Sequence, residues 1–526
     1  MTASRRARKH SASVFALRNT VGDSAGPPAE PAPDFIDHAV RGTDTGQPAR
    51  PAEHPPLQTS DACPKPERNA CMDLDTDLQK RTTAKVSRRL VPLLVAIYFV
   101  SYLDRSNISF AKLQMSDDLS MTATTFGLTS GIFFIGYVVV EVPSNLALHR
   151  FGARKWIARI MITWGVISSL MGFVPNVTIF SIGRFLLGIA EAGLYPGILL
   201  YLTYWIPREQ RARVTALFLL AIPLASVLGS PLSTWLMSAF DGHGILAGWR
   251  WMFVIEGLPA VVLAFVVWFA LTDRPGQAKW LSAEEREWLT AKLAEEERDT
   301  ADAHGLSSLR TSLFNSRVLV LCVIYFCLVF GQYALTFFLP TIVDSLGERA
   351  GTHFSLVEVG LISAVPYLFA AAALLVVGRH SDRTGERPLH VAIPVLVSAV
   401  AFAGALFFGS PIAALLALSV GAAGLFGAYP SLWQLPTEFL TGTAAAGGLA
   451  LINSLGNIAG FAAPYATGAI ADASGGSYRP PMIVMSIVLL AAAVLVIAIR
   501  NRLGTSSRPA SAALTPTTTS HGDIAA

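Results

Sequence analysis

Four charged residues lie inside apolar stretches of this sequence, where a charge needs a chemical purpose or a partner. Asp104 and Arg105 come about 14 residues into the first apolar run, and Arg184 and Glu191 lie seven residues apart within a later run. A helix of about 14 residues reaches only about 21 Å, less than the ~30 Å hydrocarbon thickness of a bilayer. If these runs cross a membrane, all four charges lie within it. Arg184 and Glu191, nearly two turns apart, would share one helix face.

Such charges are costly, and two interpretations of them remain open. Each costs about 2.5 to 3.5 kcal/mol at the middle of a membrane helix, so the four groups need mutual pairing or a watery cavity. They could form two salt bridges that only join two helices. Alternatively, Arg105 or Arg184 binds a carboxylate through its planar guanidinium, while Asp104 and Glu191 carry protons. Protonation of the acids would free the arginines, so that proton and anion binding favour each other.

Uncharged polar side chains in later apolar runs are further candidates for substrate contact. Asn453 and Asn457 share one helix face, beside two glycines whose spacing permits close helix approach. Their amides could bind substrate hydroxyls or carboxylates, or a neighbouring helix. The remaining candidates are Tyr195, Gln332, Tyr333, Tyr429 and Trp433. For Tyr195 the alternative is packing against Pro196, and we expect interfacial or structural roles for Glu141 and Glu256, near span ends.

The composition indicates that these runs are membrane spans. Of 526 residues, 52% are apolar and 14% are charged, against about 25% charged in a typical soluble domain. This leaves too few charges to cover a water-facing surface, so a soluble enzyme is nearly excluded. The net charge of +4 is spread between apolar runs, so we expect no nucleic-acid partner. No C-x-x-C, H-E-x-x-H or P-loop motif occurs, so we expect no metal, no cofactor, no catalytic residues and no ATP-driven transport.

Twelve apolar runs of about 18 to 30 residues recur along the chain, each long enough to span a bilayer as a helix. Their approximate limits are 90–111, 125–148, 156–173, 177–206, 213–239, 251–271, 318–346, 356–377, 389–408, 412–435, 444–471 and 481–499. Basic residues gather in the loops after spans two, four and eight and after span twelve, which predicts cytoplasmic N and C termini. The prediction is an all-α integral membrane protein with twelve transmembrane helices.

Polar segments divide the chain into parts. The Pro-, Ala-, Ser- and Arg-rich segment 1–71 predicts a disordered extension, or a start that truly lies at Met72, and 503–526 predicts a disordered tail. The polar segment 272–316 predicts a cytoplasmic central loop. Within it, Ser282 and Glu285 have the spacing of a helix capping box.

The apolar remainder forms two six-helix halves, 72–271 and 317–502, that repeat. Three pairs of motifs lie 233 or 234 residues apart: His149 to Gly152 with Asp382 to Gly385, Tyr195-Pro196 with Tyr429-Pro430, and Ser230-Pro231 with Ala463-Pro464. A nearly constant offset is typical of parallel internal repeats, and it places the substrate path between the halves.

The loop after span eight carries the motif G-x-x-x-D-R-x-G-x-R, formed by Gly378, Asp382, Arg383, Gly385 and Arg387. With twelve spans in two halves and a long central loop, this motif resembles the major facilitator superfamily and implies conformational roles for these loop residues. The counterpart after span two keeps Arg150, Gly152 and Arg154 but has His149 where the family usually has Asp. That departure puts the usual loop-to-helix charge pair of the first half in doubt.

Further motifs between 86 and 502 narrow the resemblance to the anion:cation symporter family, also called phthalate permeases. They are Tyr102 to Asn107, Glu141 to Asn145, Arg184 to Gly188, Glu191 to Gly193, Asp273 to Pro275 and Asn453 to Asn457. Within that family the chain looks most similar to tartrate-type organic anion transporters. The resemblance implies uptake of organic anions with protons.

We therefore expect a monomeric, proton-coupled importer of a small organic anion, working by alternating access in the plasma membrane, or in the inner membrane of a bacterium. The substrate would be a hydroxylated dicarboxylate such as tartrate, a sugar acid or an aromatic acid. The alternative is a proton-coupled efflux antiporter of metabolites or drugs. Efflux members of the superfamily tend to carry G-x-x-x-G-P in span five, and the stretch from Ala225 to Pro231 departs from that pattern.

Overall fold

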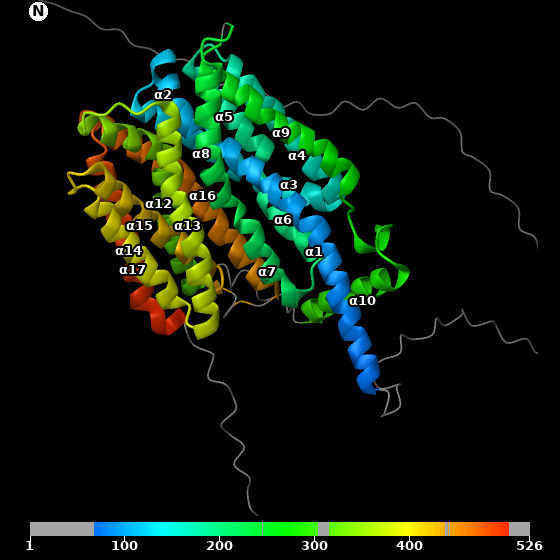
Figure 1. Cartoon of the computed structure of the whole chain (residues 1–526). Coiled ribbons are helices and arrows are strands. Elements are labelled where there is room, and N and C mark those ends of the chain that lie inside the picture. The colour runs from blue at the N-terminus through cyan, green and yellow to red at the C-terminus, as the bar shows by residue number, and fades with distance from the viewer. Residues whose placement is uncertain (1–67, 245, 303–314, 437–439, 441, 504–526) are drawn as a thin grey trace, which may run out of the picture. The chain divides into compact units, whose positions relative to one another are not determined.

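The computed structural model describes residues 68–244, 246–302, 315–436, 440 and 442–503. Figure 1 shows them as a bundle of long helices, and these residues contain no strand. Most of the predicted N-terminal extension and of the predicted C-terminal tail lies outside the described residues. The last four residues of the extension, from Arg68, already belong to the first helix.

The helices follow one another along the chain with short connections. They are α1 (Arg68–Ser106), α2 (Ile108–Asp118), α3 (Ala123–Phe151), α4 (Ala153–Leu170), α5 (Val177–Glu191), α6 (Leu194–Thr203), α7 (Arg208–Leu219), α8 (Ala221–Phe240), α9 (Gly248–Ala270), α10 (Ala283–Asp302), α12 (Ser316–Arg349), α13 (Leu356–Thr384), α14 (Pro388–Gly404), α15 (Pro411–Leu432), α16 (Gly442–Ala473) and α17 (Arg479–Leu503). Two short 3₁₀ turns are η2 (Met171–Phe173) and η3 (Pro275–Gln277).

The predicted all-α membrane fold is confirmed, with a difference in the number of spans. Within the described residues, 10 helices are long and apolar enough to cross a membrane. Helix α14, the predicted ninth span, has 17 residues and is shorter, and α16, the predicted eleventh, is not among the 10. The total of twelve spans and the cytoplasmic termini therefore stay predictions.

The predicted fourth span is present as one candidate span, Val177–Thr203, but it is built from two helices. Helix α5 ends at Glu191 and α6 begins at Leu194, because Gly193 adopts a φ of 87°, a backbone conformation that favours glycine. The carbonyl of Ala192, left without a helical partner, accepts a 2.6 Å hydrogen bond from the Ser144 hydroxyl of α3. The break places the Glu191 carboxylate at a helix end inside the bundle.

Two other predicted spans are also divided. The first breaks at Asn107, between α1 and α2, and the fifth breaks at Leu220, between α7 and α8. The break at Asn107 lies two residues after Arg105. The side-chain amide of Asn107 is thereby available to partners on other helices.

The internal repeat is visible in matching helices. Helices α3 and α13 have the same length, 29 residues, and both of their ends differ by 233 in number. Each is followed by a glycine with positive φ, Gly152 at 88° and Gly385 at 70°. The sequence offset therefore reflects a repeated structural unit.

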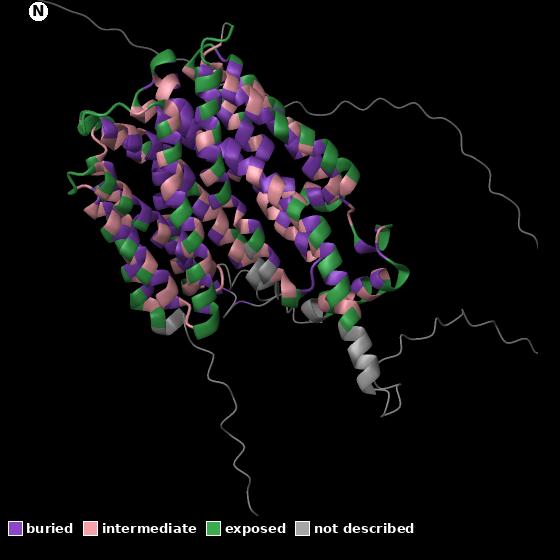
Figure 2. Ribbon diagram, in the orientation of Figure 1, coloured by how far each residue is buried: buried purple, intermediate pink, exposed green. Residues whose placement is uncertain are grey.

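The halves pack against each other through α3 with α16 and α8 with α13. Gly127 of α3 faces the backbone of Pro464 so closely that a Cβ would collide with its carbonyl. Figure 2 shows buried residues on the inward helix faces and exposed ones outside. Large apolar side chains on the outer faces, such as Val262, Phe265 and Phe269 of α9, are exposed, as expected for surfaces that contact lipid.

Two sets of contacts join the halves at the end of the bundle where α2 ends, which we call the α2 end. The Lys112 ammonium donates hydrogen bonds to the Tyr478 hydroxyl, at 2.7 Å, and to Thr341, at 3.0 Å. The Asp472 carboxylate accepts the backbone N–H groups of Ala123 and Thr124, at 3.1 and 2.7 Å. These N–H groups open α3, where the helix dipole favours an anion.

Helix α10 lies in the central polar segment and begins with the predicted capping box. The Ser282 hydroxyl accepts the backbone N–H of Glu285 at 3.1 Å, and the Glu285 carboxylate accepts the N–H of Ser282 at 2.9 Å. Glu285 also accepts a 2.7 Å hydrogen bond from Lys85 of α1, which anchors α10 to the first half. Leu289 of α10 is fully buried.

Candidate functional site

A buried ion pair between α1 and α5 lies at the centre of the candidate site. A terminal guanidinium nitrogen of Arg105 is 2.5 Å from Glu191 Oε1, and the Ser101 hydroxyl donates to the same oxygen at 2.5 Å. The Glu191 side chain is 1% exposed. Its other oxygen, Oε2, has no hydrogen-bond partner among the described residues.

The second intramembrane arginine, Arg184 of α5, is fully buried at 0% exposure. None of its three guanidinium nitrogens has a hydrogen-bond partner within the described part of the chain. The Phe133 ring of α3 contacts both arginines, with its centroid 5.1 Å from the Cζ atom of Arg105 and 5.1 Å from that of Arg184. The Tyr137 ring lies 5.5 Å from Arg105. Aromatic faces attract cations, but they leave the N–H donors of Arg184 unsatisfied.

Asp104 belongs to a separate buried network. It accepts hydrogen bonds from the Ser168 hydroxyl of α4 and, at 3.5 Å, from the Asn107 amide. The same amide nitrogen lies 3.0 Å from Glu256 Oε2, and the Ser233 hydroxyl donates to Glu256 Oε1 at 2.7 Å. Asp104 therefore does not pair directly with an arginine. Of the two salt bridges that could join spans one and four, the described residues form only one, between Arg105 and Glu191.

The amides of α16 contact the other half of the protein. Asn453 donates a 2.9 Å hydrogen bond to Glu141 Oε1 of α3, and Asn457 lies beside the same carboxylate. Close approach occurs at the adjacent glycines, where Gly456 meets the Tyr325 ring and Gly460 meets Phe134. In this structure Asn453 makes a hydrogen bond to a neighbouring helix. The sequence left this role open as the alternative to substrate contact.

Gln332 of α12 connects side chains of both halves. Its amide nitrogen donates to the Tyr102 hydroxyl of α1 at 3.0 Å, and its oxygen accepts from the Tyr429 hydroxyl of α15 at 2.5 Å. Tyr333 follows Gln332, and its ring packs against Phe134 with centroids 4.5 Å apart. Gln332, Tyr333 and Tyr429 are thus brought together, as their candidate roles require.

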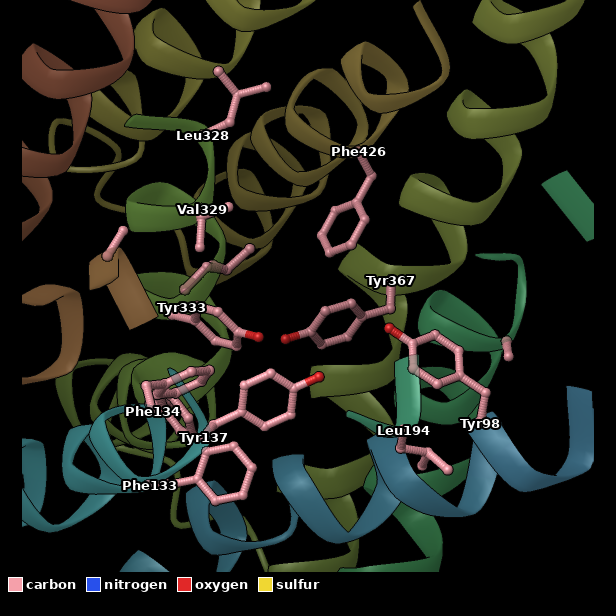
Figure 3. Packing of buried hydrophobic residues seen from close by; sticks show 14 of the residues in the cluster. Tyr98, Phe133, Phe134, Tyr137, Leu194, Leu328, Val329, Tyr333, Tyr367 and Phe426 are labelled. Carbon is pink, nitrogen blue, oxygen red and sulfur yellow. The ribbon is translucent and has the colours of Figure 1, made fainter. Parts of the chain in front are cut away.

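The remaining aromatic candidates lie at the sides of this cluster. Tyr195 stacks on Tyr98, with ring centroids 5.5 Å apart. Trp433 meets the Tyr325 ring edge-on at 4.9 Å. Figure 3 shows the phenol oxygens of Tyr98, Tyr137, Tyr333 and Tyr367 directed from both halves toward one region.

The loop motif of the first half holds its helix end through a different acid. Gly152 turns the chain with its positive φ, and the backbone N–H of Arg154 donates a 2.8 Å hydrogen bond to the Asp273 carboxylate. Asp273 follows α9 and caps the N-terminus of α4, while Arg150 is exposed. An acid distant in sequence thus provides a negative charge at the loop where His149 replaces the usual Asp.

The loop motif of the second half contains its own charge pair. Asp382 is 2.9 Å from an Arg387 guanidinium nitrogen, and it accepts a 3.3 Å hydrogen bond from Gln434. Gly378 is buried and Arg383 is exposed. This loop therefore ties the end of α13 to the segment after α15.

Comparison with known proteins identifies the family. The model of the Major Facilitator Superfamily matches residues 94–464, more than half of the chain, and matches again at 321–522. The chain belongs to the Major Facilitator Superfamily. It is thus a multi-pass membrane transporter, as the sequence predicted.

Relatives within the Major Facilitator Superfamily include a protein of Agrobacterium vitis named "Putative tartrate transporter". It is 46% identical over 427 residues, which cover 81% of this chain and 93% of that protein. A protein of Acinetobacter baumannii named "Quinolone resistance transporter" is 38% identical over 422 residues, which cover 80% and 95%. A solved structure of a bacterial homologue of the human lysosomal transporter Spinster shares the fold, with a TM-score of 0.62 and 18% identity over 81% of this chain and 99% of that one.

Several residues of this cluster were not chosen from the sequence. Tyr102 and Asn107 flank the Asp104-Arg105 pair, and Glu141 and Glu256 were expected near span ends. Both glutamates are buried, at 5% and 2% exposure. The sequence did contain a signal that could have identified Glu256. It is a single carboxylate within an apolar run, with at least four apolar or small residues on either side.

Proposed function

We propose that this chain is a proton symporter that imports a small organic anion. The observation that carries the proposal is the buried Arg105–Glu191 pair at 2.5 Å beside Arg184, whose N–H donors have no hydrogen-bond partner among the described residues. Two guanidinium groups, each 5.1 Å from the centroid of the Phe133 ring, form a fixed positive charge. A planar guanidinium binds a carboxylate with two parallel hydrogen bonds.

Coupling follows from competition for Arg105. When Glu191 is ionised, its carboxylate occupies the guanidinium, so an anionic substrate has to displace it. Protonation of Glu191 removes the negative charge and leaves Arg105 available to the substrate carboxylate. Proton and substrate then increase each other's affinity, which is the coupling free energy that symport needs. Asp104, one residue before Arg105, is the second proton carrier.

The uncharged side chains that the second half contributes to the site support the substrate class. The amides of Gln332 and Asn453 hydrogen-bond to Tyr102 and Glu141 of the half that carries the arginines, and amides suit the hydroxyls of a hydroxylated dicarboxylate. The name of the Agrobacterium vitis relative refers to tartrate, a compound of this class. Sugar acids share the hydroxyls, and aromatic acids would instead stack on rings such as Tyr333, so the three classes are ranked in that order.

Alternating access would move the halves 72–271 and 317–502 about this site, with 272–316 as the cytoplasmic connection and the chain acting as a monomer. The Lys112 and Asp472 contacts join the halves at the α2 end. By the predicted orientation this is the outer side. Opening it would require both sets of hydrogen bonds to break.

The test is substrate-dependent alkalinisation of the medium by cells that make the protein. Tartrate, a sugar acid and an aromatic acid are added separately, with cells lacking the protein as the control. Symport predicts a rise in external pH with one of the acids and accumulation of that acid against its gradient. Uptake of every transported acid without any proton movement would contradict the proposal.

A second candidate is proton-coupled efflux, favoured by the relative named for quinolone resistance. Efflux predicts that cells making the protein tolerate a quinolone better and retain less of it. The same cells would then show no accumulation of organic acids. Measuring both activities in one strain separates the two candidates.

A further inference from the structure

The buried residue Glu256 lies outside the cluster around Arg105 and Arg184, and its surroundings favour a carboxyl group that keeps its proton. Glu256 lies on α9, which packs against α4, α8, α1, η2 and α2. Both of its oxygens accept hydrogen bonds, Oε1 from Ser233 at 2.7 Å and Oε2 from Asn107 at 3.0 Å. All of these donors are neutral.

Asn107 joins this glutamate to a second carboxylate. Its single amide nitrogen carries two hydrogens, and it lies 3.0 Å from Glu256 Oε2 and 3.5 Å from Asp104 Oδ1. Asn107 and both acids are buried. Two ionised carboxylates bridged by one neutral amide in a dry interior repel each other, and such a pair holds a proton.

The charged groups around Glu256 offer it no counter-ion. Helix α8 and η2 have no charged residue, and α1 presents Asp104. On α2, Lys112 bonds to Tyr478 and Thr341, and Asp117 and Asp118 are exposed.

The remaining charges on neighbouring elements are also directed elsewhere. On α4, Lys155 is exposed and Arg154 lies at the helix start by Asp273, while Arg159 lies over the Trp156 ring at 4.0 Å. On α9 itself, Arg250 donates to the Val174 carbonyl at 2.6 Å. Asp104, in contrast, lies near two charges: the Glu191 carboxylate, which opposes its ionisation, and the Arg184 guanidinium, which favours it. Of the two acids, Asp104 is therefore the one with a cation nearby among the described residues, so it is the one that ionises once Glu191 is protonated.

We propose that Glu256 stays protonated throughout the transport cycle and acts as a positioning residue, leaving Asp104 free to gain and lose a proton. With Glu256 neutral, the pair carries one negative charge at most. When Asp104 takes a proton from water, that charge disappears, and when Asp104 returns it, Asn107 and Ser168 donate to the new carboxylate. The role of Asp104 rests on the proposed symport, whereas the proton on Glu256 does not.

The direct test is infrared spectroscopy of the purified full chain in lipid at neutral pH. The difference between wild type and Glu256→Gln should contain the carbonyl band of a protonated carboxyl group. Glu285→Gln is the matched control, because Glu285 is also buried but is paired with Lys85, so its difference spectrum should contain a carboxylate band. A carboxylate band for Glu256→Gln as well would overturn the proposal.

A variant that keeps the acid covers the case in which Glu256→Gln does not fold. Glu256→Asp retains the carboxyl group in a new position, so the frequency of the protonated-carboxyl band should shift relative to wild type. An unchanged band would assign that proton to another residue and contradict the proposal.

Transport provides the second measurement. Glu256→Gln imitates a protonated glutamate, so pH-driven accumulation should stay within about threefold of wild type, whereas Asp104→Asn should reduce it at least about tenfold. A Glu256→Gln protein that exchanges substrate but cannot accumulate it would show that Glu256 itself carries the moving proton. If wild-type protein shows no proton-driven uptake, the proposed function fails, and the infrared result still decides the state of Glu256.

Discussion

The two halves share a helical frame but differ in the chemistry of their buried side chains. In the described part of α1 to α9, the buried charged residues are Asp104, Arg105, Lys112, Glu141, Arg184, Glu191 and Glu256. In the described part of α12 to α17, the buried polar side chains are neutral, such as Gln332, Thr336 and Thr467. Yet α3 and α13 match in length and in offset.

This difference indicates a division of labour. Only groups that titrate can exchange protons at ordinary pH, so under the proposed symport we expect coupling to depend on the first half. Neutral amides and phenols discriminate between substrates by hydrogen bonding and shape, so we expect selectivity to depend more on the second half. Variants in the two halves should therefore fail in different ways.

The largest expected effect is the loss of coupling in Glu191→Gln. A permanently neutral side chain cannot compete for Arg105 in a pH-dependent way, so pH-driven accumulation should fall by the typical coupling factor of about 5- to 150-fold. Counterflow exchange in proteoliposomes should remain. Retained pH-driven accumulation would exclude Glu191 as an essential proton carrier and break the assignment of coupling to the first half.

A smaller effect is expected for Arg105→Lys, which keeps the charge but removes the planar fork. Loss of one of two charge-assisted hydrogen bonds to a carboxylate should raise the KM for uptake by about tenfold or more. Arg479→Lys, at the exposed first residue of α17, is the control. Uptake at the parental rate would remove Arg105 from the substrate site.

Gln332→Leu tests the division of labour between the halves with a variant in the second half. The amide bridges Tyr102 and Tyr429, and each lost hydrogen bond contributes about 1 kcal/mol. We expect a KM several-fold higher, with the pH dependence of uptake unchanged. A shift in the pH profile without a change in KM would contradict the division of labour.

The smallest effect concerns Glu285, a buried acid in neither half. Burial alone would raise the pKa of Glu285, but the hydrogen bond from Lys85, the Ser282 N–H and the charges of Lys85 and Arg81 outweigh it and lower the pKa below 4.5. Its stabilising contribution is therefore present above about pH 4.5 and is lost as the pH falls through the lowered pKa. Because Lys85 is half exposed, we expect Glu285→Gln to cost about 1 kcal/mol.

Hydrogen exchange of the α10 backbone amides measures this local stability. Protection should fall in Glu285→Gln at neutral pH and match wild type once the acid is protonated. Lys292→Met is a suitable comparison, because Lys292 pairs with Glu295 on the same helix at 3.4 Å and with Glu209 of α7 at 3.8 Å, so it removes a different contact of α10. Equal protection in wild type and Glu285→Gln at neutral pH would mean that this pair does not anchor α10.

Apolar run length predicted that Asp104, Arg105, Arg184 and Glu191 lie inside the membrane region, because the run before Asp104 is too short to span a bilayer and the run around Arg184 and Glu191 continues on both sides. It could not assign their partners. Arg105 and Glu191 lie 86 positions apart, and Asp104 meets Ser168, a residue with no distinctive sequence signal. The break after Glu191 was missed because apolar content continues through it, although Gly193 and Pro196 were visible.

The sequence by itself determined the class of this protein: a helical membrane protein built as a repeat, since hydrophobicity and offset are properties of the chain alone. The tertiary structure decided the chemistry of each buried charge. It joined Arg105 to Glu191, left Arg184 without a hydrogen-bond partner among the described residues, and connected Asp104 to Glu256 through Asn107. The physical reason is that pairing in a dry interior depends on distances of a few ångströms between helices, which no single helix specifies.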